Sequence, residues 1–419
     1  MATEQGHKES LSRRLGDLVK LFSRLGVVGF GGPQAHIAMA NDETVGRRQW
    51  LTQEQFTDGL AVCEMLPGPA STQMGIYIGY VRAGQLGALA AGLAFIAPAF
   101  LIVVTLSWVY FRYQSLPQLE ALFFGVSPVM IAIILGFCWK LGKKAIRDGV
   151  GVLIALFIFG LTLIQINTLL LFILAGLVGL WLYGPRGPQL PSLFLSGAFV
   201  PLITVPLITT GLIARVPAEV LTLSSFWGIE RITTYFWPLL SFFLKTGTFI
   251  FGGGLVIIPL LELEVVEKLH WLSRTEFLNG IAIGQLSPGP VVLTAAFVGY
   301  KVAGVLGALV ASVGIFTPSF LFIMAGAPVL MRLRQNPWVK GFLNGVKPAV
   351  LGAIAAAAFP LAGAAFGQAT PLLSALAVAI GVTSLIVLIR FRVATWLLVL
   401  IGALLGLVVG LIPGLWVPS

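Results

Sequence analysis

The chain has 419 residues, of which 58% are hydrophobic and only 10% are charged. Its mean hydropathy of +0.97 excludes an ordinary soluble protein, in which about a quarter of the residues are charged. The formal net charge of +10 does not indicate nucleic-acid binding, because the basic residues sit mainly at the ends of apolar segments, as topology determinants do. The composition predicts an all-α polytopic membrane protein in the lipid bilayer. Two cysteines and three histidines offer no disulfide framework and no metal or redox centre, so no cofactor is expected.

The first predicted element is an interfacial amphipathic helix in residues 1–24. The first twenty residues are charged and lack an apolar core, so no cleavable signal peptide is predicted. The apolar residues fall on one helical face and the basic residues elsewhere, which favours a helix lying at the membrane surface. The apolar face consists of Leu11, Leu15, Leu18, Val19, Phe22 and Leu25.

An internal repeat then organises the rest of the chain. Residues 30–69 and 251–290 align without a gap and share 14 of 40 positions. Phe-Gly-Gly opens both segments and Pro-Gly-Pro closes both, and a one-residue slip restores the match further on, as at Gly125 and Gly345. A period this long is typical of a duplicated transporter and not of a solenoid. We predict a first repeat over 25–187, a linker span within 188–224 and a second repeat over 225–419.

Each repeat is expected to contain a re-entrant hairpin broken at Pro-Gly-Pro. In the first repeat the two flanking helices are predicted at residues 52–66 and 70–82. Each helix would be about 20 Å long at 1.5 Å per residue, too short to cross a bilayer alone. Longer apolar segments follow, and the whole chain is predicted to form about nine full spans, or up to thirteen if the re-entrant segments are counted.

The basic residues in the loops predict that the second repeat is inverted. In the first repeat, four of them follow the second span, from Lys140 to Arg147. In the second repeat the bias is reversed: Arg332, Arg334 and Lys340 follow the first long span, whereas residues 361–371 carry no charge. Equivalent loops therefore prefer opposite sides of the membrane.

The paired motifs are the predicted substrate site. In inverted repeats, substrate binds near the midplane between broken helices whose ends point at it. Glycines allow a close backbone approach, and free amides at a helix N-terminus attract an anion. Two such ends facing inward would suit a small tetrahedral dianion. The candidate binding residues are Gly31, Gly32, Pro67, Gly68, Pro69, Ser71 and Thr72 in the first repeat, and Gly252, Gly253, Pro288, Gly289, Pro290 and Thr294 in the second.

Basic residues at matched positions of the two repeats indicate that the substrate is negatively charged. Arg24 and Lys245 lie six residues before each Phe-Gly-Gly. We assign them to the permeation path with the same weight as to membrane anchoring. Arg47 and Lys268 also match, but a glutamate four residues earlier offers each of them a helical ion pair.

Glu64 is the acidic residue beside the first Pro-Gly-Pro, and Gln285 replaces it in the second repeat. An acid within a membrane segment is a functional candidate, here for coupling proton and anion movement. A hydrogen-bonded structural role is the equally weighted alternative. His36 and Cys63 are interpreted as packing residues.

These motifs resemble the chromate ion transporter (CHR) family in its long, two-domain bacterial form. The resemblance rests on Phe30-Gly31-Gly32-Pro33, Trp50-Leu51, Phe56 and Leu66-Pro67-Gly68-Pro69, and on the corresponding motifs of the second half. It covers nearly the whole chain. It implies a multi-pass inner-membrane protein that exports chromate and confers chromate resistance, with sulfate as a related anion.

Two other functions were weighed against a secondary transporter of an oxyanion. A channel or facilitator for small anions would have the same fold, but its conductance would not saturate at low concentration. A membrane enzyme is disfavoured because the chain has no dinucleotide fingerprint, no haem or iron–sulfur ligand set and no Ser-His-Asp arrangement. The oligomeric state, including a homo-oligomer, is left open by the sequence.

Overall fold

The computed structural model describes residues 10–185, 226–250, 254–333, 336–391 and 393–412, and every regular element within them is helical. The first half contains α1 (Leu11–Val28), α2 (Pro33–Asn41), η1 (Asp42–Arg47), α3 (Gln53–Met65), α4 (Ala70–Tyr113), α5 (Pro117–Ala145), α6 (Gly149–Leu163) and α7 (Thr168–Tyr183). The second half contains α11 (Ile229–Gly247), η3 (Gly254–Val256), α12 (Ile257–Leu261), η4 (Glu262–Lys268), α13 (Arg274–Leu286), η5 (Val291–Leu293), α14 (Thr294–Leu333), α15 (Pro337–Phe366), α16 (Pro371–Phe391) and α17 (Thr395–Gly410). Apart from the one-turn helices η3 and η5, the order of elements is therefore the same in the two halves.

The sequence explains where the broken helices begin and end. Thr52 and Ser273 each cap a short helix with a full capping box, α3 and α13 respectively. Both short helices end just before Pro-Gly-Pro. The next helix then bends where a glycine takes a positive φ, at Gly84 (+64°) in α4 and Gly304 (+57°) in α14. The predicted short helices at 52–66 and 70–82 are thus present, as α3 and the first part of α4.

The apolar helices identify a multi-pass membrane protein. Within the described residues, five are long and apolar enough to cross a membrane: Ala70–Tyr113, Pro117–Ala145, Val291–Ala325, Pro337–Phe366 and Pro371–Phe391. Three shorter apolar helices are α6, α7 and α17. Large apolar side chains such as Trp181 and Phe157 point away from the protein, as expected of a surface in contact with lipid. The predicted linker span in 188–224 lies outside the described residues, so the total of about nine spans stays a prediction.

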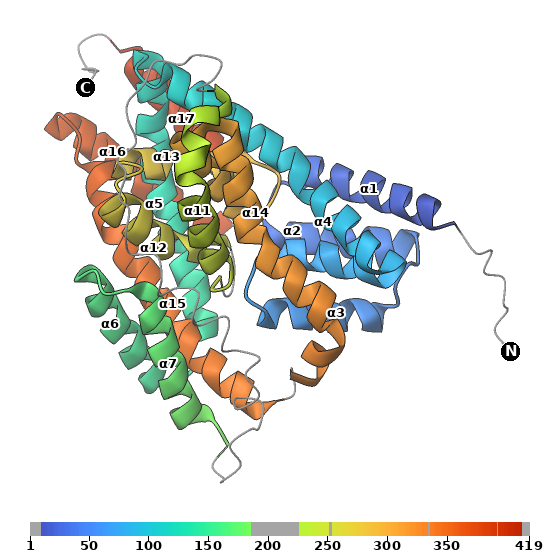
Figure 1. Cartoon of the computed structure of the whole chain (residues 1–419). Coiled ribbons are helices and arrows are strands. Elements are labelled where there is room, and N and C mark those ends of the chain that lie inside the picture. The colour runs from blue at the N-terminus through green and yellow to red at the C-terminus, as the bar shows by residue number, and fades with distance from the viewer. Residues whose placement is uncertain (1–9, 186–225, 251–253, 334–335, 392, 413–419) are drawn as a thin grey trace, which may run out of the picture.

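Helix α1 lies along α4, as Figure 1 shows in blue. Three residues of its predicted apolar face are buried there, Leu18, Phe22 and Leu25, together with the neighbouring Leu21. Leu11 and Val19 of the same face are exposed. The amphipathic pattern therefore indicated a real packing face, and the helix packs on protein along much of that face.

The helices form two bodies, which are built from both halves of the chain. We call α1–α4 with α11–α14 the motif body, because they carry the glycine–proline motifs, and α5–α7 with α15–α17 the scaffold body. In the motif body α1 packs on α4, α11 on α14, and α4 on α14. In the scaffold body α5 packs on α15, α16 and α17, and α15 packs on α6 and α7. The two halves are thus interlocked and do not form separate domains.

Glycines make the helix crossings of the scaffold body close. A side chain at Gly125 in α5 would overlap the backbone of Gly402 and Gly406 in α17. A side chain at the equivalent Gly345 in α15 would overlap the backbone of α7 at Gly179. Small residues at such crossings allow membrane helices to approach closely.

Gly345→Ala should therefore lower the thermal unfolding midpoint of the detergent-solubilised protein by several degrees, because the added methyl group forces α15 away from α7. Gly363→Ala is the matched control on the same helix, since a Cβ there would meet nothing within 4 Å. Circular dichroism or a dye-binding melt measures both variants. Equal midpoints for the two variants would contradict the proposed crossing.

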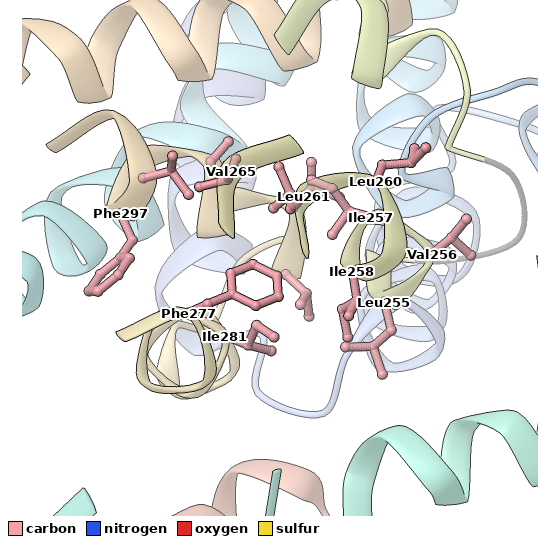
Figure 2. Packing of buried hydrophobic residues seen from close by; sticks show 14 of the residues in the cluster. Leu255, Val256, Ile257, Ile258, Leu260, Leu261, Val265, Phe277, Ile281 and Phe297 are labelled. Carbon is pink, nitrogen blue, oxygen red and sulfur yellow. The ribbon is translucent and has the colours of Figure 1, made fainter. Parts of the chain in front are cut away.

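The two hairpin regions differ in how they are buried. In the second half, α12 and α13 pack on α15, and α13 packs also on α5 and α17. Figure 2 shows the apolar core that this produces, with Ile257, Ile258 and Leu261 close to Phe277 and Ile281. In the first half, α2 and α3 pack on α4 and belong to a separate core, and neither packs comparably on the scaffold body. In Figure 1, accordingly, α1, α2 and α3 stand to one side and α12 and α13 lie in the middle.

Candidate functional site

The first Pro-Gly-Pro forms a tight turn between α3 and α4. Gly68 has a φ of +131°, a conformation that favours glycine. The side-chain amide of Gln73 donates from Nε2 to the Pro67 carbonyl at 2.7 Å and so closes the turn. Pro69 is the N-cap residue, and the helix begins at Ala70. The free amides of this first turn therefore face the turn region.

The motifs of the two halves are crossed. The amide of Gly68, in the first Pro-Gly-Pro, donates to the carbonyl of Ile250 at 2.6 Å, just before the second Phe-Gly-Gly. The imidazole of His36 contacts the carbonyl of Pro288 at 2.9 Å, in the second Pro-Gly-Pro. The same Nε2 contacts the carbonyl of Gly29, the residue equivalent to Ile250. Each Pro-Gly-Pro therefore meets the region of the other half's Phe-Gly-Gly.

Unpaired polar groups gather at the first Pro-Gly-Pro. The hydroxyls of Ser71 and Thr72 and the Oε1 atom of Gln73 have no hydrogen-bond partner, although these residues are buried. Ser319, from α14 of the second half, is fully buried and its hydroxyl is also unpaired. A side chain at Gly68 would overlap both the Ser319 hydroxyl and the Gln73 amide, so these groups border the turn. We call Gly68, Ser71, Thr72, Gln73 and Ser319 the polar cradle.

The polar cradle can bind an anion. An unsatisfied buried hydroxyl costs about 1–3 kcal/mol, so three of them at one place indicate a missing partner. Hydroxyl groups can all rotate to donate, and the N-terminus of a 13-residue helical segment adds about half a positive charge. An oxyanion would satisfy these donors together.

The second Pro-Gly-Pro has no equivalent cradle among the described residues. The one-turn helix η5 that follows it is formed by Val291, Val292 and Leu293, all buried and apolar. The Thr294 hydroxyl already donates to the Val291 carbonyl at 2.9 Å. Gly289 lies against Ala99, where the first half has Ser319 against Gly68. Two equivalent helix ends were expected, but the polar groups are concentrated at one of them.

The Phe-Gly-Gly glycines shape the chain before α2. Gly31 and Gly32 have φ values of +123° and +78°, and Gly32 is the N-cap residue of α2. A side chain at either position would be strained. Gly252 and Gly253 lie outside the described residues, and their predicted role stays a prediction.

The matched cations lie beside carboxylates. Arg24 is 67% exposed and its guanidinium is 3.8 Å from Glu43, a carboxylate that Arg47 and Arg48 also contact. Lys245 is half-buried and borders a small pocket with Glu264. The helical ion pairs weighed for the second matched set are confirmed, Arg47 with Glu43 at 3.1 Å and Lys268 with Glu264 at 3.0 Å. Arg47 also pairs with Asp42 at 3.2 Å, so three arginines share two carboxylates in this cluster.

Glu64 is exposed on α3, three residues before Pro67. Its charge is within electrostatic range of Lys347 on α15. Cys63 is buried, as its interpretation as a core residue requires. Sequence reasoning missed Ser319 and Lys347 and underrated His36. Ser319 directly follows Pro318, which the repeat matches to Pro98, and this position was the one available signal for it.

A larger pocket of about 490 Å³ lies at the start of α13. Its cations are already paired, Arg274 with Glu267 at 2.7 Å and Lys301 with Glu276 at 2.8 Å. The polar cradle is the better candidate for an anion, because its donors lack partners.

A known protein family matches this chain in two separate segments, one in each half. The family model described as chromate transporter matches residues 16–180 and again residues 237–407. The chain belongs to the chromate transporter family. A chromate transport protein of Cupriavidus metallidurans is 36% identical over 353 residues, which are 83% of this chain and 82% of that protein. A probable chromate transport protein of Synechococcus elongatus is 33% identical, over 82% of this chain and 83% of its own length.

A shorter relative supports the reading of the chain as a duplicated unit. The uncharacterized transporter YwrA of Bacillus subtilis is 29% identical over 158 residues, which cover 38% of this chain but 88% of YwrA. One half of this family member thus corresponds to a whole protein elsewhere. No solved structure matches the chain significantly.

Proposed function

We propose that this protein is a secondary transporter that exports chromate, and related tetrahedral oxyanions such as sulfate, across the bacterial inner membrane. The observation that carries the proposal is the polar cradle: buried, unpaired hydroxyls at a helix N-terminus where the crossed motifs meet. The names of the full-length relatives supply chromate as the substrate. Chromate and sulfate are both tetrahedral dianions near neutral pH and have the same need for several donors.

The binding groups come from both halves. Ser71 and Thr72 follow the first Pro-Gly-Pro, and Ser319 reaches the same turn from α14. Gly68 leaves the space that a side chain would fill. On this proposal, the second Pro-Gly-Pro and both Phe-Gly-Gly segments shape the backbone around the anion, and Thr294 contributes less than the sequence indicated.

The two repeats, 25–187 and 225–419, are proposed to be inverted and joined by a linker span in 188–224. The order of neighbours along the two helices supports this: a Cβ on Gly142, near the end of α5, would contact Leu351 in the middle of α15 at 3.5 Å, whereas Arg147, five residues later, acts on Lys347, four residues earlier. Equivalent helices α5 and α15 therefore run in opposite directions. The basic residues of 140–147 and Lys340 then lie toward one face, which the positive-inside rule makes cytoplasmic.

The membrane potential favours export. At an inside-negative potential of about 100 mV each charge is worth about 2.3 kcal/mol, so expelling a dianion gains roughly 4.6 kcal/mol. Glu64 is the proposed proton-coupling residue, because it lies exposed beside the cradle turn. Arg24 and Lys245 are proposed to draw the anion toward the motifs by long-range attraction, which their neighbouring carboxylates reduce but do not cancel.

Chromate uptake into everted membrane vesicles tests the function. We expect saturable uptake that requires this protein, is driven by the membrane potential and is inhibited by excess sulfate. Arg24→Gln and Lys245→Gln should each slow uptake, most strongly at low ionic strength. Vesicles with the same amount of Gly160→Ala protein are the control, because a Cβ at Gly160 would meet nothing within 4 Å. Absence of protein-dependent uptake would refute chromate export, and a flux that never saturates would indicate a channel.

A further inference from the structure

The two hairpins differ at one pair of equivalent contacts. In the second half, Asn279 of α13 donates from Nδ2 to the Tyr110 hydroxyl at 3.1 Å. Ser127 of α5 donates its hydroxyl to Asn279 Oδ1 at 3.4 Å. All three residues are buried. The bond from Ser127 therefore attaches the second hairpin to the scaffold body in a dry contact, and the bond to Tyr110 attaches it to α4.

The equivalent positions in the first half carry charges. Asp58 of α3 aligns with Asn279, and Lys347 of α15 aligns with Ser127. Helices α3 and α15 lie wholly within the described residues but do not pack on each other as α13 packs on α5. Lys347 is accordingly exposed, whereas its counterpart Ser127 is buried. The helix contact is therefore made between α13 and α5, and its equivalent between α3 and α15 is not made to the same extent.

Lys347 is an unusual residue for its place in the fold. It lies ten residues after the start of α15 at Pro337, about 15 Å into a helix long enough to cross the membrane. Its immediate neighbours Val346 and Pro348 are buried. A cation within a span is costly and is a functional candidate by default. Its charge interacts with the charges of Glu64 and Arg147.

We propose that Lys347 is an anion-binding residue of the transport route, which contacts the oxyanion between α3 and α15 on its way to the polar cradle. The proposal rests on the proposed function for its substrate class. Two arguments support it. The charge of Glu64, on the helix that leads directly into Pro67, acts on Lys347, and the exposed Lys347 side chain is accessible to an anion. The cluster with Arg147 and Glu64 is net positive.

Two simpler roles for Lys347 make different predictions. A topology anchor would tolerate any polar residue. A distant source of positive potential would lose its effect in salt and could be replaced by other cations on the same helix. A direct contact depends on the charge at this position and persists at high ionic strength.

Equilibrium binding of radiolabelled sulfate and chromate to the purified full-length protein in detergent tests the assignment. Lys347→Gln should weaken binding of both anions by at least tenfold, as loss of a hydrogen bond to a charged group implies. Lys347→Arg should retain binding close to wild type. Lys340→Gln is the matched control, seven residues earlier and so on nearly the same face of α15. All proteins are measured at low and high salt, and wild-type uptake is measured in vesicles in parallel.

Each outcome decides the assignment. Wild-type affinity in Lys347→Gln, or an equal loss in Lys340→Gln, overturns it. If the wild-type protein binds neither anion, both the assignment and the proposed function fail. If Lys347→Gln alone loses binding but wild-type vesicles transport no chromate, the assignment stands and chromate export fails.

Discussion

Replacing Gly68 with alanine should abolish transport, although the protein should still reach the membrane. The φ of +131° at this position is strained for any residue with a side chain, at a cost of about 1–3 kcal/mol. The new methyl group would also overlap the Ser319 hydroxyl and the Gln73 amide, which border the proposed anion position. The turn would have to move, and with it the hydrogen bond from Gly68 to Ile250 that joins the two halves.

Vesicle uptake normalised to the amount of inserted protein measures this effect. Gly160→Ala in α6 controls for the general effect of adding a methyl group to a membrane helix, because the position has open space around it. Near-normal uptake by Gly68→Ala would show that the first Pro-Gly-Pro does not need its backbone conformation, and it would remove this turn from the site.

Removing the cradle hydroxyls should raise the KM for chromate while leaving the fold intact. In Ser71→Ala and Thr72→Val each side chain keeps nearly the same shape but loses a donor. A hydrogen bond to a charged partner is worth about 1.5–3 kcal/mol, so each variant should raise the KM roughly tenfold to a hundredfold. Neither hydroxyl has a protein partner to lose, so thermal stability without substrate should be unchanged or higher.

Thr294→Val is the matched control from the second half. Its hydroxyl already bonds the Val291 carbonyl, within its own turn, and it should have little effect on the KM. Equal effects of Thr72→Val and Thr294→Val would restore the symmetric site that the sequence favoured. Unchanged KM values in the two first-half variants would refute binding at the cradle.

Several features could be predicted because they depend on local physical rules. The apolar composition and the segments from residue 86 onward led to the membrane helices. The spacing of Trp50, Phe56 and Pro67 in both halves led to the short helices, since capping and Pro-Gly-Pro breaks are encoded within a few residues. The ion pairs of Arg47 and Lys268 followed from the four-residue spacing on a helix.

Other features could not be predicted from the repeat itself. The alignment pairs Pro67 with Pro288 as equivalents, but equivalence in sequence says nothing about contact in space. The crossing of the motifs, and the approach of Ser319 to Gly68, depend on how α4 packs on α14. The alignment also treated the two helix ends as equal, whereas one bears hydroxyl groups and the other bears valines and a leucine.

By itself the sequence determined that this is a duplicated, helical membrane protein with a repeated glycine–proline break in each half, and its motifs already resembled the family to which it belongs. Hydropathy, helix capping and backbone strain act over a few neighbouring residues, so they can be read along the chain. Only the tertiary structure decided that the halves interlock, that one hairpin packs on the scaffold body while the other does not, and that Ser319 lies beside the first motif. Those relations arise from packing between segments far apart in the chain, 152 residues for Ser127 and Asn279, and no local preference encodes them.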